Sequence, residues 1–298
     1  MTSQTTFIHH HREIFRDSTD RKNALVQRSC GVLLRWFLSG VCTLIMLVST
    51  SEVSAEHRPI AGDEFKAPEE ALIERDQGVW YGLYTSYWIT KKWGYYGEYH
   101  LRYADFHNRL SKLYLRLGAN YKVDQQFRIT MGVVNRYTWT DHPGSPEEED
   151  YVPEFRFWEQ LLFKNRYFGM RLYHQLRVEQ RWRRSTRIVD PTYYYYNRFR
   201  YKFLGYAPIF GQLTRKNSLF FCFYNEIFMQ AGKKIQYNYY EDNRSYLGLG
   251  YALTDKVQIH VGYMKSFGQL DEFTFRNHDI LRVSLYHKHY FFDDANIH

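Results

Sequence analysis

Proline, glycine and cysteine are scarce in this chain of 298 residues, which contains 7 Pro, 18 Gly and 3 Cys. The scarcity of Pro and Gly excludes a collagen-like repeat, and charge at only 24% with aromatic residues at 19% excludes a disordered chain. The mean hydropathy of −0.58 excludes a bundle of membrane-spanning helices, each of which needs about 20 apolar residues. A membrane β-barrel is compatible with this value, because its strands carry apolar side chains only at every second position.

One uncharged segment does occur, and it lies near the N-terminus. The sixteen residues Trp36 to Ser51 follow a basic region that ends at Arg35, which is typical of a signal peptide. The small residues Val53 to Ala55 predict cleavage at the end of this triplet. The basic region is longer than in most signal peptides, so either translation starts downstream of Met1 or the leader is extended. An uncleaved membrane anchor is the alternative, although the apolar run is short for a spanning helix.

We therefore expect a signal peptide (1–55), an N-terminal segment (56–77) that is partly flexible and holds a candidate first strand, a barrel (78–292) and a tail (293–298). Export removes two of the three cysteines and leaves Cys222 alone, so cysteine supplies no internal disulfide, metal site or redox pair. The mature chain keeps a net charge of +6, from 34 basic and 28 acidic residues. Positive charge with many aromatic rings also suits nucleic-acid binding, but export argues against that partner.

From about Gly78 onward, polar and apolar residues alternate with a period of two. In Ser111 to Val123 a helix would scatter Arg116 and Lys122 onto the leucine face, whereas a strand separates them completely. Met170 to Arg183 alternates over fourteen residues, which is long for a soluble strand and suits a tilted membrane strand. Eleven strands are predicted in this way: Val79–Thr90, Trp93–Tyr103, Ser111–Val123, Phe127–Trp139, Glu154–Phe163, Met170–Arg183, Tyr193–Tyr206, Ser218–Gln230, Glu241–Ala252, Val257–Phe267 and His278–Tyr290.

The connections between these strands alternate in length. The short ones are Lys91-Lys92, Asp124-Gln125, Lys164 to Tyr167 and Thr254 to Lys256, and the long ones are Thr140 to Pro153, Arg184 to Thr192, Ala231 to Tyr240 and Gly268 to Asn277. Outer-membrane barrels have short periplasmic turns and long external loops, which requires one more strand before Val79; a weak candidate lies in Phe65 to Gln77. Since bacterial barrels usually have an even strand count, we predict an all-β, antiparallel up-and-down transmembrane β-barrel of about twelve strands, with ten as the alternative.

Aromatic residues collect where these strands are expected to meet the membrane interfaces. They include Trp80, Trp88, Trp93, Trp139, Trp182, Tyr193 to Tyr196, Tyr237, Tyr239 and Tyr240. Their amphipathic rings suit the level of the lipid headgroups. The alternative is the core of a soluble sandwich or ligand-binding barrel, against which the strand length and the export signal argue.

Several spaced motifs resemble a known bacterial family. The motifs are Trp93 with Glu98 to Arg102, Glu154 to Gln160, His174 to Arg181, Asn197 to Tyr201, Asn225 to Phe228, Asp242 to Tyr251 and Gly262 to Met264. These motifs occur in the same order, over roughly Trp80 to Tyr290, as in the bacterial family catalogued as domain of unknown function 2490, and the chain resembles that family. The resemblance implies an outer-membrane β-barrel without an assigned activity. One departure is that Asp293 to His298 follow Phe292, whereas barrels usually finish on an aromatic residue that the insertion machinery reads.

The polar side of the strands is expected to line the barrel interior, and arginine dominates it. The candidate binding residues are Glu98, Arg102, Glu154, Arg156, Gln160, Arg177, Glu179, Arg181, Arg198, Arg200, Glu226 and Arg244, and Arg116, Arg171 and Lys202 share their side. In a structural role these charges pair across the strands and fill the interior. In a functional role the surplus of Arg makes a narrow channel or pocket that attracts phosphate, carboxylate or sulfate groups.

The expected turn near Asn165-Arg166 fixes which of these residues face each other. It places Glu154 opposite or close to Arg177, and Gln160 opposite Arg171 or Tyr173.

A barrel-embedded enzyme acting on lipid or peptide is an alternative function, and it needs a nucleophile beside a base. Ser218, Ser245 and Ser266 have no His in a common motif, and His100 and His260 are isolated on their strands. No catalytic residue, metal site or cofactor is therefore predicted, and enzymatic activity stays open. The expected location is the bacterial outer membrane, with outer-membrane lipid and the barrel-insertion machinery as partners and no nucleic acid. A soluble periplasmic β-barrel that binds a small anionic ligand is the remaining alternative, and the oligomeric state does not follow from the sequence.

Overall fold

The computed structural model describes residues 72–139, 150–185, 190–232, 235, 237–270 and 272–292. The predicted signal peptide (1–55), most of the N-terminal segment and the tail (293–298) lie outside these residues. No helix among the described residues is long and apolar enough to cross a membrane.

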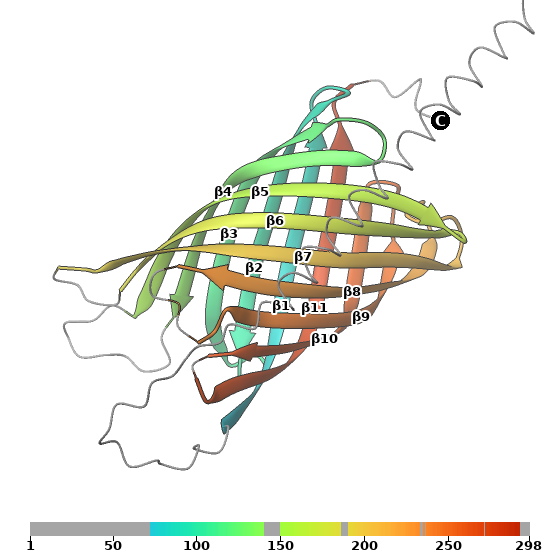
Figure 1. Cartoon of the computed structure of the whole chain (residues 1–298). Coiled ribbons are helices and arrows are strands. Elements are labelled where there is room, and N and C mark those ends of the chain that lie inside the picture. Colours follow the sequence, from blue (N-terminus) through green and yellow to red (C-terminus); the bar gives the residue numbers. More distant parts are fainter. Residues whose placement is uncertain are drawn as a thin grey trace, which may run out of the picture. The chain divides into compact units, whose positions relative to one another are not determined.

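Eleven strands form one closed barrel in this part of the chain (Figure 1). They are β1 (Leu72–Trp88), β2 (Trp93–Ala104), β3 (Arg109–Lys122), β4 (Phe127–Trp139), β5 (Tyr151–Tyr167), β6 (Met170–Arg184), β7 (Tyr193–Phe210), β8 (Ser218–Ala231), β9 (Tyr240–Ala252), β10 (Val257–Gln269) and β11 (Thr274–Tyr290). Each strand pairs with the next in the antiparallel sense, and each of the eleven predicted strands is present.

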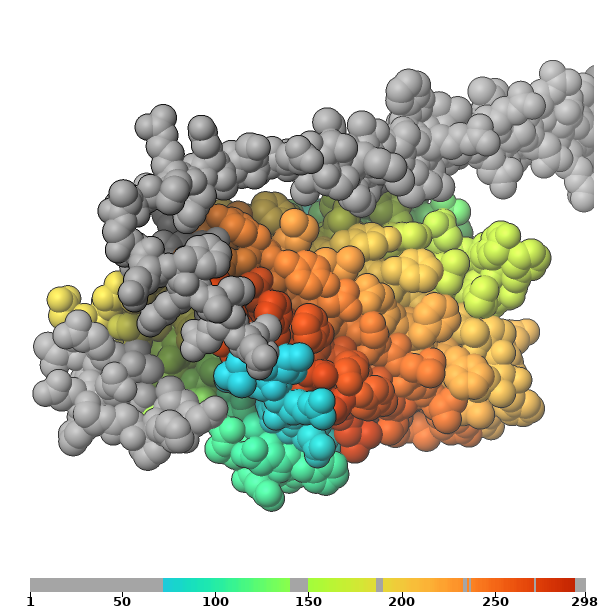
Figure 2. All heavy atoms as spheres, turned by 60° about the horizontal axis from the view of Figure 1, so that its bottom comes forward, coloured from blue at the N-terminus to red at the C-terminus, as the bar shows by residue number. Residues whose placement is uncertain are grey.

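The expected twelfth strand is not found among the described residues, and the alternative of ten strands is also wrong. Leu72 to Gln77, the described part of the weak candidate, continues directly into β1. The barrel closes without an extra strand because β1 pairs with β11 in parallel, from Leu72 opposite Thr274 to Trp88 opposite Tyr290. Figure 2 shows β1 in cyan beside β11 in red. An odd number of alternating strands makes the first and last run in the same direction, so a parallel seam is required.

Alternation decides which side chains enter the barrel. In β3, Tyr114 and Arg116 are buried at 7% and 3% exposure, while Leu115 and Leu117 on the other face are 37% and 43% exposed. Such alternation is what a sheet with two different surroundings requires. The interior accommodates bulky rings beside glycines, since a Cβ on Gly118 would lie 2.9 Å from the ring of Trp158.

The turn between β5 and β6 differs from its predicted position. Tyr167 lies opposite Met170, and the two-residue loop Phe168-Gly169 has positive φ angles of 47° and 74°. Positive φ at both central residues is the geometry that matches the twist of a tight hairpin, and glycine adopts it without strain. The Lys164 to Tyr167 connection is therefore part of β5.

The pairing of β5 with β6 shifts by six residues as a result. Glu154 lies opposite Arg183 instead of Arg177, and Gln160 lies opposite Arg177 instead of Arg171 or Tyr173.

The loops at the two ends of the barrel differ in length. One end carries 89–92, 123–126, 168–169, 211–217 and 253–256, and the other carries 105–108, 140–150, 185–192, 232–239 and 270–273. All four connections predicted to be long lie at the second end. We call these the short-loop end and the long-loop end. Strand β1 begins at the long-loop end, and β11 finishes at the short-loop end.

Two kinds of side chain share the interior. An apolar cluster comes from β1 and β8 to β11, and it consists of Trp80, Phe220, Cys222, Tyr224, Tyr246, Met264 and Ile280. Charged side chains from β2 to β7 fill much of the rest of the interior, and the candidate site lies where the two groups meet.

Candidate functional site

The twelve candidate residues all lie on the inner face of the barrel. Ten of them are buried: Glu98, Arg102, Glu154, Arg156, Gln160, Arg177, Glu179, Arg181, Arg198 and Glu226. The side chains of Arg200 and Arg244 are 9% and 14% exposed. Eight of the twelve join one network of ion pairs and hydrogen bonds, and Arg102, Arg200, Glu226 and Arg244 lie outside it.

Glu179 on β6 is the centre of this network. Its carboxylate is completely buried, and it accepts hydrogen bonds from Arg156 at 2.7 Å, Arg198 at 2.6 Å and Arg116 at 3.1 Å. Arg177 lies 3.9 Å away. A carboxylate without water is stable only when cations and hydrogen-bond donors surround it, and here guanidinium groups from β3, β5, β6 and β7 do so.

Two more glutamates extend the network toward the long-loop end. Glu154 contacts Arg136 at 2.9 Å, Arg156 at 2.6 Å and Arg181 at 2.7 Å. Glu241 contacts Arg181 at 2.9 Å and Arg198 at 3.3 Å. Glu241 enters the interior at a β-bulge between Phe228 and Met229, which shifts the register of β8 against β9.

Several contacts cross the barrel between strands that are not neighbours. Glu98 on β2 pairs with Arg116 on β3 and also with Arg177 on β6, at 3.4 Å. Arg177 donates to Gln160 at 2.9 Å, and the hydroxyl of Tyr96 donates to Glu98 at 2.9 Å. Because the Glu98–Arg177 bridge joins strands that are not neighbours, side chains cross interior space that an open pore would need.

The remaining candidates make smaller groups. Arg200 pairs with Glu226 at 2.9 Å, and Arg244 pairs with Asp242 at 2.5 Å. Arg102 makes no ion pair with a described residue; its guanidinium lies 3.5 Å from the centre of the Trp80 ring.

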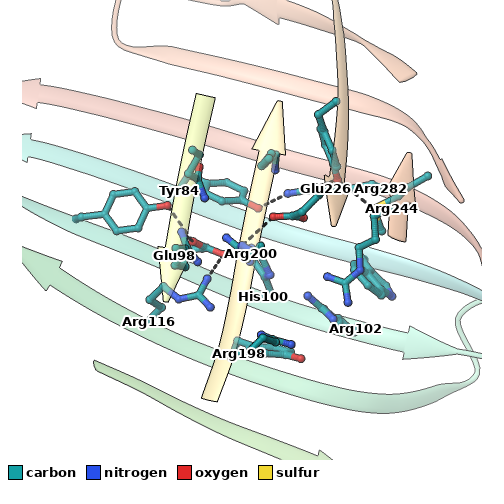
Figure 3. A pocket seen from close by; sticks show the side chains of 18 residues that line it. Tyr84, Glu98, His100, Arg102, Arg116, Arg198, Arg200, Glu226, Arg244 and Arg282 are labelled. Atoms are coloured by element: carbon teal, nitrogen blue, oxygen red, sulfur yellow. Dashed lines mark hydrogen bonds and ion pairs between the residues drawn. The ribbon is translucent and has the colours of Figure 1, made fainter. Parts of the chain in front are cut away.

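A cavity of about 70 Å³ lies beside these residues, and Figure 3 shows side chains from several strands converging on it. Its cationic lining consists of Arg102, Arg116, Arg177, Arg198, Arg200, Lys202, Arg244 and Arg282, and its acidic lining consists of Glu98 and Glu226. Pockets for drug-sized ligands hold roughly 300–1,000 Å³, so this one suits only a small ion with a few waters. The lining gives the cavity a positive potential.

Several residues of the site were missed by sequence reasoning. Arg282 faces the cavity from β11, where it donates to the hydroxyls of Tyr84 and Tyr224. Alternation along β11 could have found it. Glu241 could not have been found, because the bulge that turns it inward leaves no signal in the alternation.

Around the serine and histidine candidates, the described residues do not assemble a nucleophile, a base and an orienting group. Ser266 donates to Asp242 at 2.7 Å. His260 lies 3.6 Å from Cys222, but both side chains are buried at 3% and 2% exposure, away from the cavity lining. Among the described residues, no group of three or more His, Cys, Asp or Glu is placed to hold a metal ion.

Comparison with known proteins gives one match. A family model described as "Protein of unknown function (DUF2490)" matches residues 77–276, which is two thirds of the chain and covers most of β1, all of β2 to β10 and the start of β11. No curated protein and no solved structure matches the chain.

Proposed function

The chain belongs to the DUF2490 family of proteins of unknown function, and we propose that it is an outer-membrane β-barrel whose interior attracts small anions into one pocket without forming a diffusion pore. The observation that carries the proposal is the contrast between the two faces of the barrel: apolar outside, charged and ion-paired inside. Each part of the proposal has its own support and its own test.

Membrane insertion is supported by the outer face. Large apolar side chains are exposed around the barrel, among them Leu101, Leu117, Phe199, Leu249 and Val261 at 40% exposure or more. A soluble monomer rarely exposes a contiguous apolar patch beyond a few hundred Å², so an apolar face on every side of a barrel fits lipid.

The height of the apolar face also fits a bilayer. On β3 the outward positions from Leu113 to Tyr121 are all apolar or aromatic. With a rise of about 3.4 Å per residue and a tilt of about 40°, they span roughly 20 Å along the barrel axis, close to the ~25 Å apolar band of membrane barrels. Glu159 on β5 is an exception, since it is exposed on this face between Met131 and Val178.

The length of the loops supports an orientation with the short-loop end in the periplasm. In this orientation β11 finishes at the periplasmic end with Tyr290, and Phe291 and Phe292 follow it. Aromatic residues at this position supply the signal that we expect the insertion machinery to read. Outer-membrane lipid is the expected partner of the outer face.

A closed interior is supported by the bridges across the barrel. The pairs Glu98–Arg177, Arg116–Glu179 and Arg181–Glu241 each join strands that are not neighbours. A porin-like channel needs a continuous aqueous path, and a cavity of about 70 Å³ holds only about five waters. The narrow channel considered from the sequence is therefore the less favoured form of this proposal.

Two alternatives receive less support. A soluble periplasmic anion-binding barrel would share the interior but not the apolar outer face. A lipid- or peptide-cleaving enzyme needs a free base, whereas Glu98, Glu154, Glu179 and Glu226 each hold at least one guanidinium.

The experiment is to extract the mature protein from membranes and compare the gel mobility of boiled and unboiled samples, followed by conductance in a planar bilayer. A mobility shift with no current at any salt concentration is the expected result. Recovery of the protein in the soluble periplasmic fraction would refute membrane insertion. Stable single-channel currents would refute the closed interior while leaving insertion intact.

A further inference from the structure

Three cations that face the cavity have no carboxylate partner among the described residues. Five of the eight lining cations form ion pairs with Glu98, Glu179, Glu226, Glu241 or Asp242. The other three are Arg102 on β2, Lys202 on β7 and Arg282 on β11. They come from separate strands and point into the same space.

Neutral groups hold each of these cations in place. Arg102 stacks on Trp80 and lies 4.3 Å from the ring centre of Tyr114, while its buried Nε has no hydrogen-bond partner among the described residues. Arg282 donates to two tyrosine hydroxyls.

Lys202 lies opposite Glu226 in the strand pairing, but Arg200 occupies that carboxylate. The Lys202 ammonium instead lies 3.8 Å from the centre of the Tyr224 ring. Aromatic rings and hydroxyls position a cation without cancelling its charge.

Buried cations repel one another unless an anion compensates them, and no described carboxylate forms an ion pair with any of these three. Arg102 is 8% exposed and Arg282 is 9% exposed, so bulk water solvates neither well. A bound anion would remove this cost. Three neighbouring cations without an ion-pair partner favour a multiply charged ion over chloride or a single carboxylate.

We propose that Arg102, Lys202 and Arg282 bind one phosphate group in this cavity. The inference rests on the proposed attraction of anions into the barrel and adds the class of ligand. The two guanidinium groups offer planar pairs of N–H donors that match oxyanion geometry, and the ammonium offers a third donor. The small cavity fits a phosphate group, which can be free phosphate or the end of a phosphomonoester.

The test is calorimetric titration of the full mature protein in detergent with inorganic phosphate, glycerol 3-phosphate and acetate. We expect phosphate to bind and acetate to bind at least tenfold more weakly. Equal binding of glycerol 3-phosphate would identify a phosphomonoester as the ligand, and its exclusion would identify free phosphate.

Lys202→Met is the decisive variant, because the Lys202 ammonium makes no hydrogen bond or ion pair with a described residue and methionine fills a similar volume over Tyr224. We expect it to fold and to weaken phosphate binding by about tenfold or more, from the loss of one charged contact. Lys265→Met removes an exposed lysine from the outer face and serves as the matched control, with unchanged binding.

The outcomes separate the two proposals. Equal binding of acetate and phosphate would overturn the ligand class while supporting anion attraction. Binding of no anion by a folded barrel would overturn both. Phosphate binding that Lys202→Met leaves unchanged would overturn the assignment to this cavity.

Discussion

Removing the charge of the buried Glu179 carboxylate should lower the stability of the barrel by several kcal/mol, because it leaves its guanidinium partners uncompensated. In Glu179→Gln, an NH₂ group replaces one carboxylate oxygen. This donor would face the guanidinium groups of Arg156, Arg198 and Arg116, which donate to the carboxylate in the native protein. A hydrogen bond to a charged group contributes about 1.5–3 kcal/mol, and breaking a buried ion pair costs about 3–5 kcal/mol. We therefore expect the free energy of unfolding to fall by about 3–5 kcal/mol.

The measurement is a urea titration of the protein in lipid vesicles, followed by tryptophan fluorescence. Glu159→Gln is the matched control, because it makes the same chemical change on the outer face of the neighbouring strand β5, where no described cation contacts the carboxylate. It should leave stability unchanged or raise it slightly, since a neutral amide is easier to place in lipid. Two variants that differ by less than about 1 kcal/mol would refute the reasoning about the interior network.

Three further predictions follow from the barrel geometry. Because β1 and β11 are parallel, the start of β1 and the end of β11 lie at opposite ends of the barrel. A cysteine at Ile73 should therefore react with an impermeant thiol reagent on whole cells, while one at Phe291 should react only after the outer membrane is opened. Labelling of both cysteines from the same side would contradict the topology. Native Cys222, at 2% exposure, should resist thiol reagents until the protein is boiled in SDS, and rapid reaction beforehand would show an accessible interior. Gly132→Ala should prevent formation of the SDS-resistant barrel, because the new Cβ would overlap the backbone of β3. Gly169→Ala, in an open turn, should lower the free energy of unfolding by only about 1 kcal/mol. Equal mobility shifts and equal stabilities of the two variants would contradict the β3–β4 pairing.

The strands could be predicted because the two faces of the barrel demand different chemistry at every position. Leu113 to Tyr121 shows this plainly, and the predicted bounds of β4 agree with the structure at both ends. The predicted number of strands was wrong because it assumed that bacterial barrels have an even number, an assumption that no feature of these residues supports. The register of β5 on β6 failed because Phe168-Gly169 was not recognised as a two-residue turn, although glycine is a common sign of one.

The site could be predicted only as a set of inward side chains. Alternation places Glu98 and Arg177 inside the barrel, but it does not say that they meet, since they lie 79 residues apart on strands that are not neighbours. That contact depends on the diameter of the barrel and on the stagger of its strands. For the same reason, only the structure could show that no described carboxylate pairs with Arg102.

The parallel seam between β1 and β11 has a consequence for how the barrel is made. Until β11 pairs, the sheet of β1 to β10 keeps two unpaired edges, one on β1 and one on β10. Among the described strands, β11 is the last to be synthesised and it contacts both edges. A chain truncated before Thr274 would therefore keep all the hairpins of β1 to β10 and still expose both edges of the sheet to pairing with other chains.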